Sequence, residues 1–397
     1  MRHSLDKKVK EAKVGLEIKE RFGRMRTLVR ATRWSGPIYL IWCVILVFLP
    51  VMLNIIDYNF YPASYVSGDH CFGAFDELAD LGEVCALVAV ALGCAAGIVA
   101  ASTFDSGRKG ELFLLLPKGR RSLLVSVALC ELCKALVAMW ISMLMGLGAE
   151  LAFGMPIEKN MPYFPMLLIV NTVYTVLYFS VGLFCGTVSG RTLTRALSCI
   201  ACILLPVLLC FAIDVHSIRH GEVGAFGDTV FRMFSHNSPL AYFMTGNQYS
   251  HKYFEIELRQ WHGIFFFTSP LQIFGIAIGF GIFFGLSVYL FGRVRRERRE
   301  EHFSFGVVGG VIKFLLVLEA YFAWIIFSSA AYGLDDIIYE LFGGGAVFPA
   351  TQYFPMLICL FLMFSALCNG SVRKAMREWD QLCITLALTY VLQCVIL

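Results

Sequence analysis

The stretch Asp105–Arg121, with the sequence DSGRKGELFLLLPKGRR, places two basic clusters on either side of a short apolar run. The run, Leu112–Leu116, is closed by Pro117. A helix over Glu111–Leu116 would be apolar on every side, so it has to be buried against another surface. It is too short to cross a bilayer, which takes about 20 residues. Two surfaces stay open at this point: the lipid headgroups, or a groove on a partner protein.

No other motif predicts catalysis or metal binding. The sequence contains no G-x-x-x-x-G-K-[ST], H-E-x-x-H or G-x-S-x-G pattern, so we expect no catalytic residues and no Walker-type ATP hydrolysis. The chain has 14 cysteines, and the pairs Cys130/Cys133 and Cys199/Cys202 show the C-x-x-C spacing. Each pair supplies only two ligands from one helical turn, with no interleaved His. We therefore interpret the cysteines as small packing residues and predict no metal site.

Several ionisable residues fall within or at the edges of apolar segments: Glu83, Glu131, Lys134, Glu150, Lys313 and Glu319. Such residues are the default functional sites of membrane proteins. Glu131 and Lys134 are three residues apart on one helical face and are expected to neutralise each other. Lys313 can extend its ammonium group to the membrane interface. We interpret most of these residues as structural, and no ladder of carboxylates predicts proton coupling.

The composition identifies the kind of molecule that positions these residues. Hydrophobic residues make up 58% and charged residues 16% of the 397, against about 45–50% and about 25% in soluble domains. The mean hydropathy is +0.70. We predict an all-α fold, a polytopic transmembrane helical bundle of eight or nine spans. The nine candidate spans are Gly36–Ile56, Leu81–Ala101, Leu124–Gly148, Phe164–Gly186, Ala196–Ile213, Gly263–Phe291, Val311–Ala331, Tyr353–Cys368 and Leu382–Leu397.

Positive charge alternates between the connecting loops. Basic residues gather in residues 1–34, 105–121, 190–195, 293–302 and 373–377, whereas the loops Asp57–Asp80 and Tyr332–Gln352 contain no Lys or Arg. Short loops rich in Lys and Arg remain on the cytoplasmic side. The pattern predicts a multi-pass protein of the cell (cytoplasmic) membrane with a cytoplasmic N-terminus.

The first 34 residues predict an amphipathic helix that lies in the membrane interface. Its apolar stripe consists of Val14, Ile18, Phe22, Met25 and Val29. The alternative is a solvated charged arm.

The remaining organisation that we predict is a six-span core at 35–292 with the loops 105–121 and 214–262, a basic cytoplasmic segment at 293–310, and additional spans at 311–397.

Glycines recur at four-residue spacing, which lets membrane helices approach closely. We expect helix packing at Gly182, Gly186, Gly190, Gly275 and Gly279.

The stretch Asp105–Arg121 resembles the first cytoplasmic loop of type-2 ATP-binding-cassette (ABC) transporter permeases. The matching residues are Glu111, Leu112, Leu115, Leu116, Pro117, Arg120 and Arg121. The N-terminal amphipathic helix, the six core spans and the long loop with Ser238-Pro239-Leu240 are also similar. A second stretch, Arg293–Glu319, resembles the region after the sixth span in a Firmicute-type subgroup of these permeases that carries extra C-terminal spans.

The resemblance implies a permease, and an exporter, whose loop forms a coupling helix seated on a separate ABC ATPase subunit. The coupling residues that it implies are Arg108, Lys109, Glu111, Leu112, Leu115, Leu116, Pro117, Arg120 and Arg121. The partner subunit would bind ATP, so this chain would need no cofactor and would not be an enzyme. Two permease chains, alike or different, would join two ATPase subunits. We expect contact with membrane lipids and none with nucleic acid.

An alternative hypothesis is a membrane sensor or immunity protein that binds its ligand through the outside loop 214–262 without transport. Aromatic residues give this loop an interfacial character: Phe226, Phe231, Phe234, Tyr242 and Phe243. A third hypothesis, a membrane-embedded enzyme, would need a clustered catalytic set that the sequence does not offer.

Overall fold

The computed structural model describes residues 34–49, 51–52, 73–104, 120–153, 164–220, 270–293, 303, 306–332 and 354–396. Within these ranges every named element is a helix, and the β contact found there is an isolated antiparallel bridge between Ser189 and Phe303. The predicted all-α class is confirmed. The predicted amphipathic helix before Trp34, the segment 105–119 and most of the loop 214–262 lie outside the described residues.

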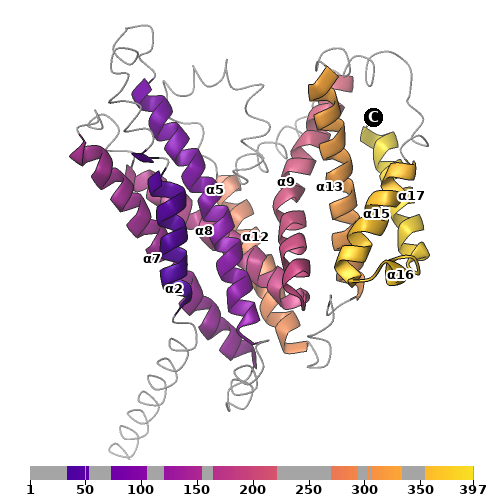
Figure 1. The fold of residues 1–397 in the computed structure, drawn as a ribbon, viewed down its shortest axis with the longest axis horizontal. Coiled ribbons are helices and arrows are strands. Elements are labelled where there is room, and N and C mark those ends of the chain that lie inside the picture. The colour runs from indigo at the N-terminus through magenta and orange to yellow at the C-terminus, as the bar shows by residue number, and fades with distance from the viewer. Residues whose placement is uncertain are drawn as a thin grey trace, which may run out of the picture.

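Five helical segments enclose the larger apolar core, on the left of Figure 1. They are α2 (Ser35–Cys43) with its π-helical continuation η1 (Val44–Phe48), α5 (Gly73–Ser102), α7 (Arg120–Ala152), α8 (Phe164–Val188) and α12 (Pro270–Arg293). Phe179 and Leu183 of α8 are completely buried at the centre of this core. We call these five segments the N-terminal group.

A second set of helices packs on the right of Figure 1. It consists of α13 (Gly306–Tyr332), α15 (Phe354–Asn369), the short α16 (Val372–Ala375) and α17 (Trp379–Ile396), which we call the C-terminal group. Helix α9 (Thr192–His220) lies between the two groups. Its Cys199 packs into the larger core, while Ala201, on the opposite side of the helix, packs with Ile312 and Leu316 of α13.

A helix lies at the position of each of the nine predicted spans within the described ranges. Four windows are long and apolar enough to cross a membrane: Cys85–Ser102, Arg120–Ala149, Leu168–Val188 and Gly275–Arg293. Shorter apolar helices occupy Ser35–Phe48, Thr192–Pro206 and Pro355–Asn369. These lengths and compositions give the chain the character of a membrane protein.

Large apolar side chains on the outward helix faces agree with this character. Trp42 of α2, Leu144 of α7 and Ile282 of α12 are each more than half exposed. An apolar surface that extends over several helices is a liability in water, where soluble proteins keep such patches small. It suits lipid chains, which are as apolar as leucine.

The most extensive contact between two described helices joins α5 and α8. A Cβ added to Gly93 of α5 would lie 2.6 Å from the carbonyl oxygen of Thr175, and one added to Gly182 of α8 would collide with the carbonyl oxygen of Cys94. The two backbones therefore touch where both helices carry glycine. Close approach of this kind gains van der Waals contact along the whole crossing.

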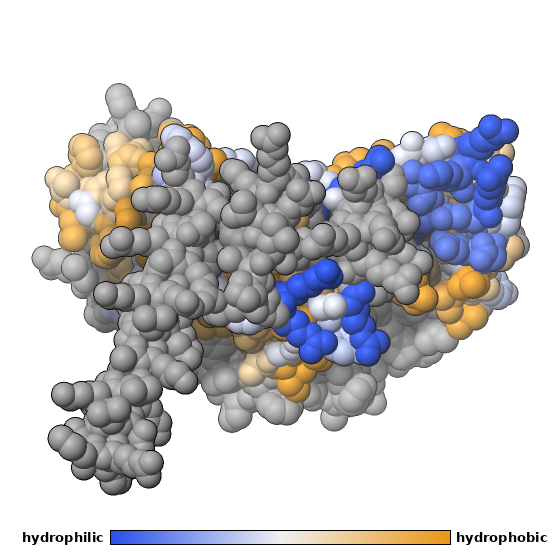
Figure 2. Space-filling model, turned by 90° about the horizontal axis from the view of Figure 1, so that it is seen from below, coloured by the Kyte–Doolittle hydropathy of each residue, from blue (hydrophilic) through white to orange (hydrophobic). Residues whose placement is uncertain are grey.

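The helix ends that carry the described loop arginines lie together at one end of the bundle. The bridge between Ser189 and Phe303 joins the end of α8 to the start of α13, and Lys313 joins the start of α13 to Glu378 before α17. We call this the basic end, and its exposed or half-exposed cations are Arg120, Arg121, Arg191, Arg293, Arg373, Lys374 and Arg377. Figure 2, seen from below Figure 1, shows hydrophilic patches on this face.

Candidate functional site

Two of the nine predicted coupling residues, Arg120 and Arg121, lie in the part of the chain that the structure describes, where they begin α7. The other seven lie outside it: Arg108, Lys109, Glu111, Leu112, Leu115, Leu116 and Pro117. The candidate site is therefore built from the residues that flank the segment 105–119, namely the end of α5 and the start of α7.

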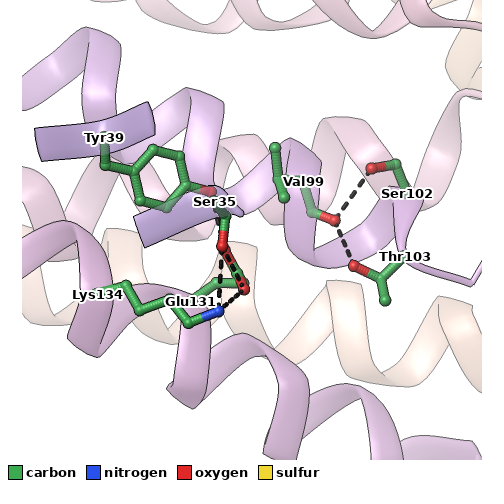
Figure 3. A network of polar contacts seen from close by, with 7 residues as sticks. All are labelled: Ser35, Tyr39, Val99, Ser102, Thr103, Glu131 and Lys134. Carbon is green, nitrogen blue, oxygen red and sulfur yellow. Dashed lines mark hydrogen bonds and ion pairs between the residues drawn. The ribbon is translucent and has the colours of Figure 1, made fainter. Parts of the chain in front are cut away.

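The end of α5 is fixed by local hydrogen bonds and by one aromatic contact. The hydroxyl groups of Ser102 and Thr103 donate to the carbonyl oxygen of Val99 over 3.0 and 2.8 Å, at the last turn of the helix (Figure 3). Phe104 follows and is 2% exposed. Its ring meets that of Phe291 of α12 edge to face, with centroids 5.0 Å apart. Aromatic pairs prefer this geometry, so the contact holds the end of α5 on α12.

The start of α7 rests on the same turn of α12. A Cβ added to Gly292 would lie 2.6 Å from Nε of Arg121, so the arginine packs closely over this glycine. Cζ of Arg121 is 5.7 Å from the centroid of the Tyr289 ring, and Cζ of Arg293 is 4.6 Å from it. A guanidinium within about 6 Å of an aromatic ring is attracted to its face. Both flanks of the segment 105–119 thus contact the last turns of α12.

A buried polar network ties α2 to α7 in the N-terminal group (Figure 3). The side chain of Glu131 is fully buried, and Nζ of Lys134 lies 2.7 Å from its Oε1. The predicted pairing of these two residues is confirmed. Helix α2 completes the network, because Ser35 donates to Oε1 over 3.1 Å and Tyr39 donates to Oε2 over 2.9 Å. The carboxylate thus accepts three hydrogen bonds where water is excluded.

The buried Lys313 forms a second ion pair, in the C-terminal group. Its Nζ lies 2.7 Å from both carboxylate oxygens of Glu378, and Ser365 and Asn369 of α15 complete the network around the carboxylate. The side chain of Lys313 is only 4% exposed. The expectation that Lys313 extends to the membrane interface is wrong, because a carboxylate from the turn before α17 meets it inside the bundle.

Glu319 of α13 is the buried carboxylate for which the described part of the chain offers no hydrogen-bond partner at either oxygen. It is 7% exposed and lies near Cys202 of α9. The side chains of Glu83 and Glu150 are not among those that the structure describes. Glu319 therefore differs from Glu131 and Glu378, whose carboxylates are paired with lysine.

Four cysteines meet where α5, α8 and α9 cross. Sγ of Cys185 lies 3.9 Å from Sγ of Cys202, and Cys199 is within hydrogen-bonding reach of both Cys94 and Cys185. All four thiols are free. Among the residues that the structure describes, no group of three or more His, Cys, Asp and Glu side chains has the arrangement of a metal site. Sequence reasoning recognised the C-x-x-C pair of α9 but had no signal for Cys94 and Cys185, which other helices contribute.

The predicted packing glycines occupy three different settings. Gly182 and Gly186 lie in the contact of α8 with α5, and a Cβ on Gly279 of α12 would lie 3.3 Å from Cδ1 of Leu177. Gly275 is half-buried in the first part of α12. Gly190 lies after the end of α8, in the turn to α9, so it does not continue the glycine series of that helix.

The turn that contains Gly190 is held by the buried Arg195, whose Nε donates to the carbonyl oxygen of Ser189 over 2.9 Å.

Comparison of the chain with protein-family models, with curated proteins and with solved structures finds no match.

Proposed function

We propose that this chain is the membrane-spanning permease subunit of an ABC exporter, driven by a separate cytoplasmic ATPase subunit. The observation that carries the proposal is the contact of both flanks of the segment 105–119 with one turn of α12. Phe104 meets Phe291, and Arg121 covers Gly292. A displacement of the segment by the ATPase would therefore move α5, α7 and α12 together.

The packing of α5 on α8 would transmit this displacement to α8. Because glycines bring the two backbones into contact, α5 cannot slide along α8 without steric collision. A displacement of α5 would then move α8 with it as a single body. Packed helices respond to a driven change by moving as rigid units rather than by deforming continuously. In this mechanism ATP-driven closure of the ATPase subunits swings these helices against the rest of the bundle.

The orientation in this proposal follows from charge. The basic end faces the cytoplasm, because loops rich in Lys and Arg are retained there. The chain then crosses the cell membrane eight or nine times with its N-terminus inside. ATP binding and hydrolysis belong to the ATPase subunit. By the resemblance of its loop, this chain works beside a second permease chain.

Truncation of the apolar run tests this proposal. In the coupling arrangement Leu112 and Leu115 fill a groove on the ATPase, so the double change Leu112→Ala/Leu115→Ala should remove about 2 kcal/mol or more of binding energy. The matched control is Leu129→Ala/Leu144→Ala, two leucines of α7 that are 53% and 54% exposed. The measurement is recovery of a Walker-type ATPase with the tagged chain from detergent extracts, identified by mass spectrometry.

The expected result is loss of the ATPase with the first pair and full recovery with the control pair, at equal amounts of membrane-inserted chain. A single change at a rim arginine, Arg120→Gln, should cost at most about 1 kcal/mol, because exposed ion pairs contribute little. Burial of the run in the headgroups predicts a different outcome. Equal recovery with both leucine pairs would exclude the coupling role and the permease function that rests on it.

A further inference from the structure

The chain between α15 and α17 presents a cluster of cations at the basic end. Helix α15 ends at Asn369, and Gly370 turns the chain with a φ of 65°, a conformation that glycine adopts without strain. The segment Ser371–Trp379 follows, and its Arg373, Lys374 and Arg377 are all exposed. Hydrogen bonds from the amides of Met376, Arg377 and Glu378 to carbonyl groups three or four residues earlier hold α16 and the turn that leads from it to α17.

The acidic residue of this segment does not offset the cations, because it faces inward. Glu378 binds Lys313 through both carboxylate oxygens at 2.7 Å and accepts a hydrogen bond from Ser365. Its charge is therefore compensated by a lysine that is 3% exposed and belongs to another helix. The outer face keeps three cations against the single carboxylate of Asp380.

Apolar side chains lie beside the cations. Val372, Met376 and Trp379 are 63%, 53% and 60% exposed. Val372 and Met376 are four residues apart in α16 and its C-cap and so share a helical face, whereas Trp379 is the first residue of α17. Ala375, on the inner side, is 1% exposed and fixes which face turns outward. The segment thus exposes apolar and cationic side chains together.

We propose that Ser371–Trp379 binds the headgroups of anionic phospholipids in the adjoining leaflet. Arg373, Lys374 and Arg377 contact the phosphate groups, while Val372, Met376 and Trp379 enter the boundary between headgroups and acyl chains. Charge complementarity selects this occupant, since basic residues near the membrane attract anionic lipids and tryptophan favours the interface. The pairing of Glu378 with Lys313 leaves the cations free to bind phosphate. The proposal is independent of ATP-driven transport.

Trp379 supplies a direct probe of the proposed contact. The experiment uses the full chain with the five other tryptophans of the six changed to Phe, reconstituted in phosphatidylcholine vesicles. A fixed fraction of the lipid is brominated phosphatidylglycerol in one sample and brominated phosphatidylcholine in the other. We expect stronger quenching of Trp379 by the anionic lipid, and the difference should shrink as salt screens the cations.

Two matched chains complete the test. A chain that keeps only Trp42, a residue of α2 that is 61% exposed, should be quenched equally by both lipids. In the Trp379 chain, the change Arg373→Gln/Lys374→Gln/Arg377→Gln should abolish the preference while quenching persists. Equal quenching of the unmodified Trp379 chain by both lipids would overturn the proposal. Absence of quenching by either lipid would overturn it as well, because Trp379 would then face water or a protein. The salt titration needs no cation variant and so does not depend on the folding of one.

Discussion

The carboxylate of Glu131 shows how one residue can fix the contact of two membrane helices. Lys134 reaches it from the next turn of α7, while Ser35 and Tyr39 reach it from α2. A buried charge is tolerated only where it is paired and hydrogen-bonded. The carboxylate of Glu131 needs hydrogen-bond donors, and two of them come from α2. This requirement fixes the position of α2 against α7 more closely than apolar packing alone would.

Removal of one partner should cost more than removal of the pair. Lys134→Met leaves the charge of Glu131 without compensation, and we expect a loss of about 3–5 kcal/mol of stability, as is typical of broken buried pairs. Glu131→Leu/Lys134→Met should lose less, because no charge remains buried. Tyr39→Phe removes one donor and should cost roughly 0.5–1.5 kcal/mol. Thermal unfolding in detergent, followed for all three variants, measures the order, and a double variant less stable than Lys134→Met alone would refute it.

The two lysine ion pairs mark the limit of what sequence can predict at this scale. The pairing of Glu131 with Lys134 follows from helical spacing, because residues three apart share a face. The partner of Lys313 does not follow from spacing, since Glu378 is 65 residues away and reaches it only through the packing of α13 against α15 and α17. Local geometry is encoded in periodicity, whereas contacts between distant helices depend on how the helices are arranged.

The same distinction holds for elements. The glycine spacing in α8 predicts a close helix contact, and the composition predicts the helices themselves, but neither names α5 as the neighbour. Small residues indicate that a backbone can approach and do not indicate which one. Only the folded arrangement shows that Gly97 of α5 lies against the backbone of α8 at Gly182.

Alanine substitution should have opposite effects at two glycines that both lie within helices but differ in the space beside them. Gly182→Ala would drive a Cβ into the carbonyl oxygen of Cys94, and overpacking of this kind costs roughly 1–3 kcal/mol. At Gly148 of α7 no atom lies within 4 Å of an added Cβ, so Gly148→Ala should stabilise by up to about 1 kcal/mol through helix propensity. Unfolding temperatures of the two variants decide the matter, and equal effects would contradict the close contact of α5 and α8.

On the scale of the whole molecule, the basic residues at the described helix ends gather at one end of the bundle although they are separated along the chain. The alternation of basic and acidic loops in the sequence predicts this grouping, and the contacts between helix ends agree with it. The division of the helices into two groups with α9 between them was not predictable, because hydropathy marks segments that can enter a membrane and is silent about their neighbours.

Cysteine labelling from one side of the membrane tests this polarity. Phe153→Cys places a thiol just after the end of α7, at an exposed position remote from the basic end, and Arg191→Cys places one in the exposed turn between α8 and α9. A membrane-impermeant maleimide should label the first in intact cells and the second only after permeabilisation. The unmodified chain gives the background from its native cysteines. Labelling of Arg191→Cys in intact cells would reverse the proposed orientation.

The two ion pairs also differ in the time at which they can form during synthesis. The partners of Glu131 in α2 precede it by 96 and 92 residues, and Lys134 follows within one turn, so the charge is compensated as soon as α7 enters the membrane. Lys313 has to wait for Glu378, 65 residues later. At about 5–20 residues per second this interval lasts roughly 3 to 13 s. We expect the ammonium group of Lys313 to stay in the headgroups during that time, so that the C-terminal group packs fully only after Glu378 has been made.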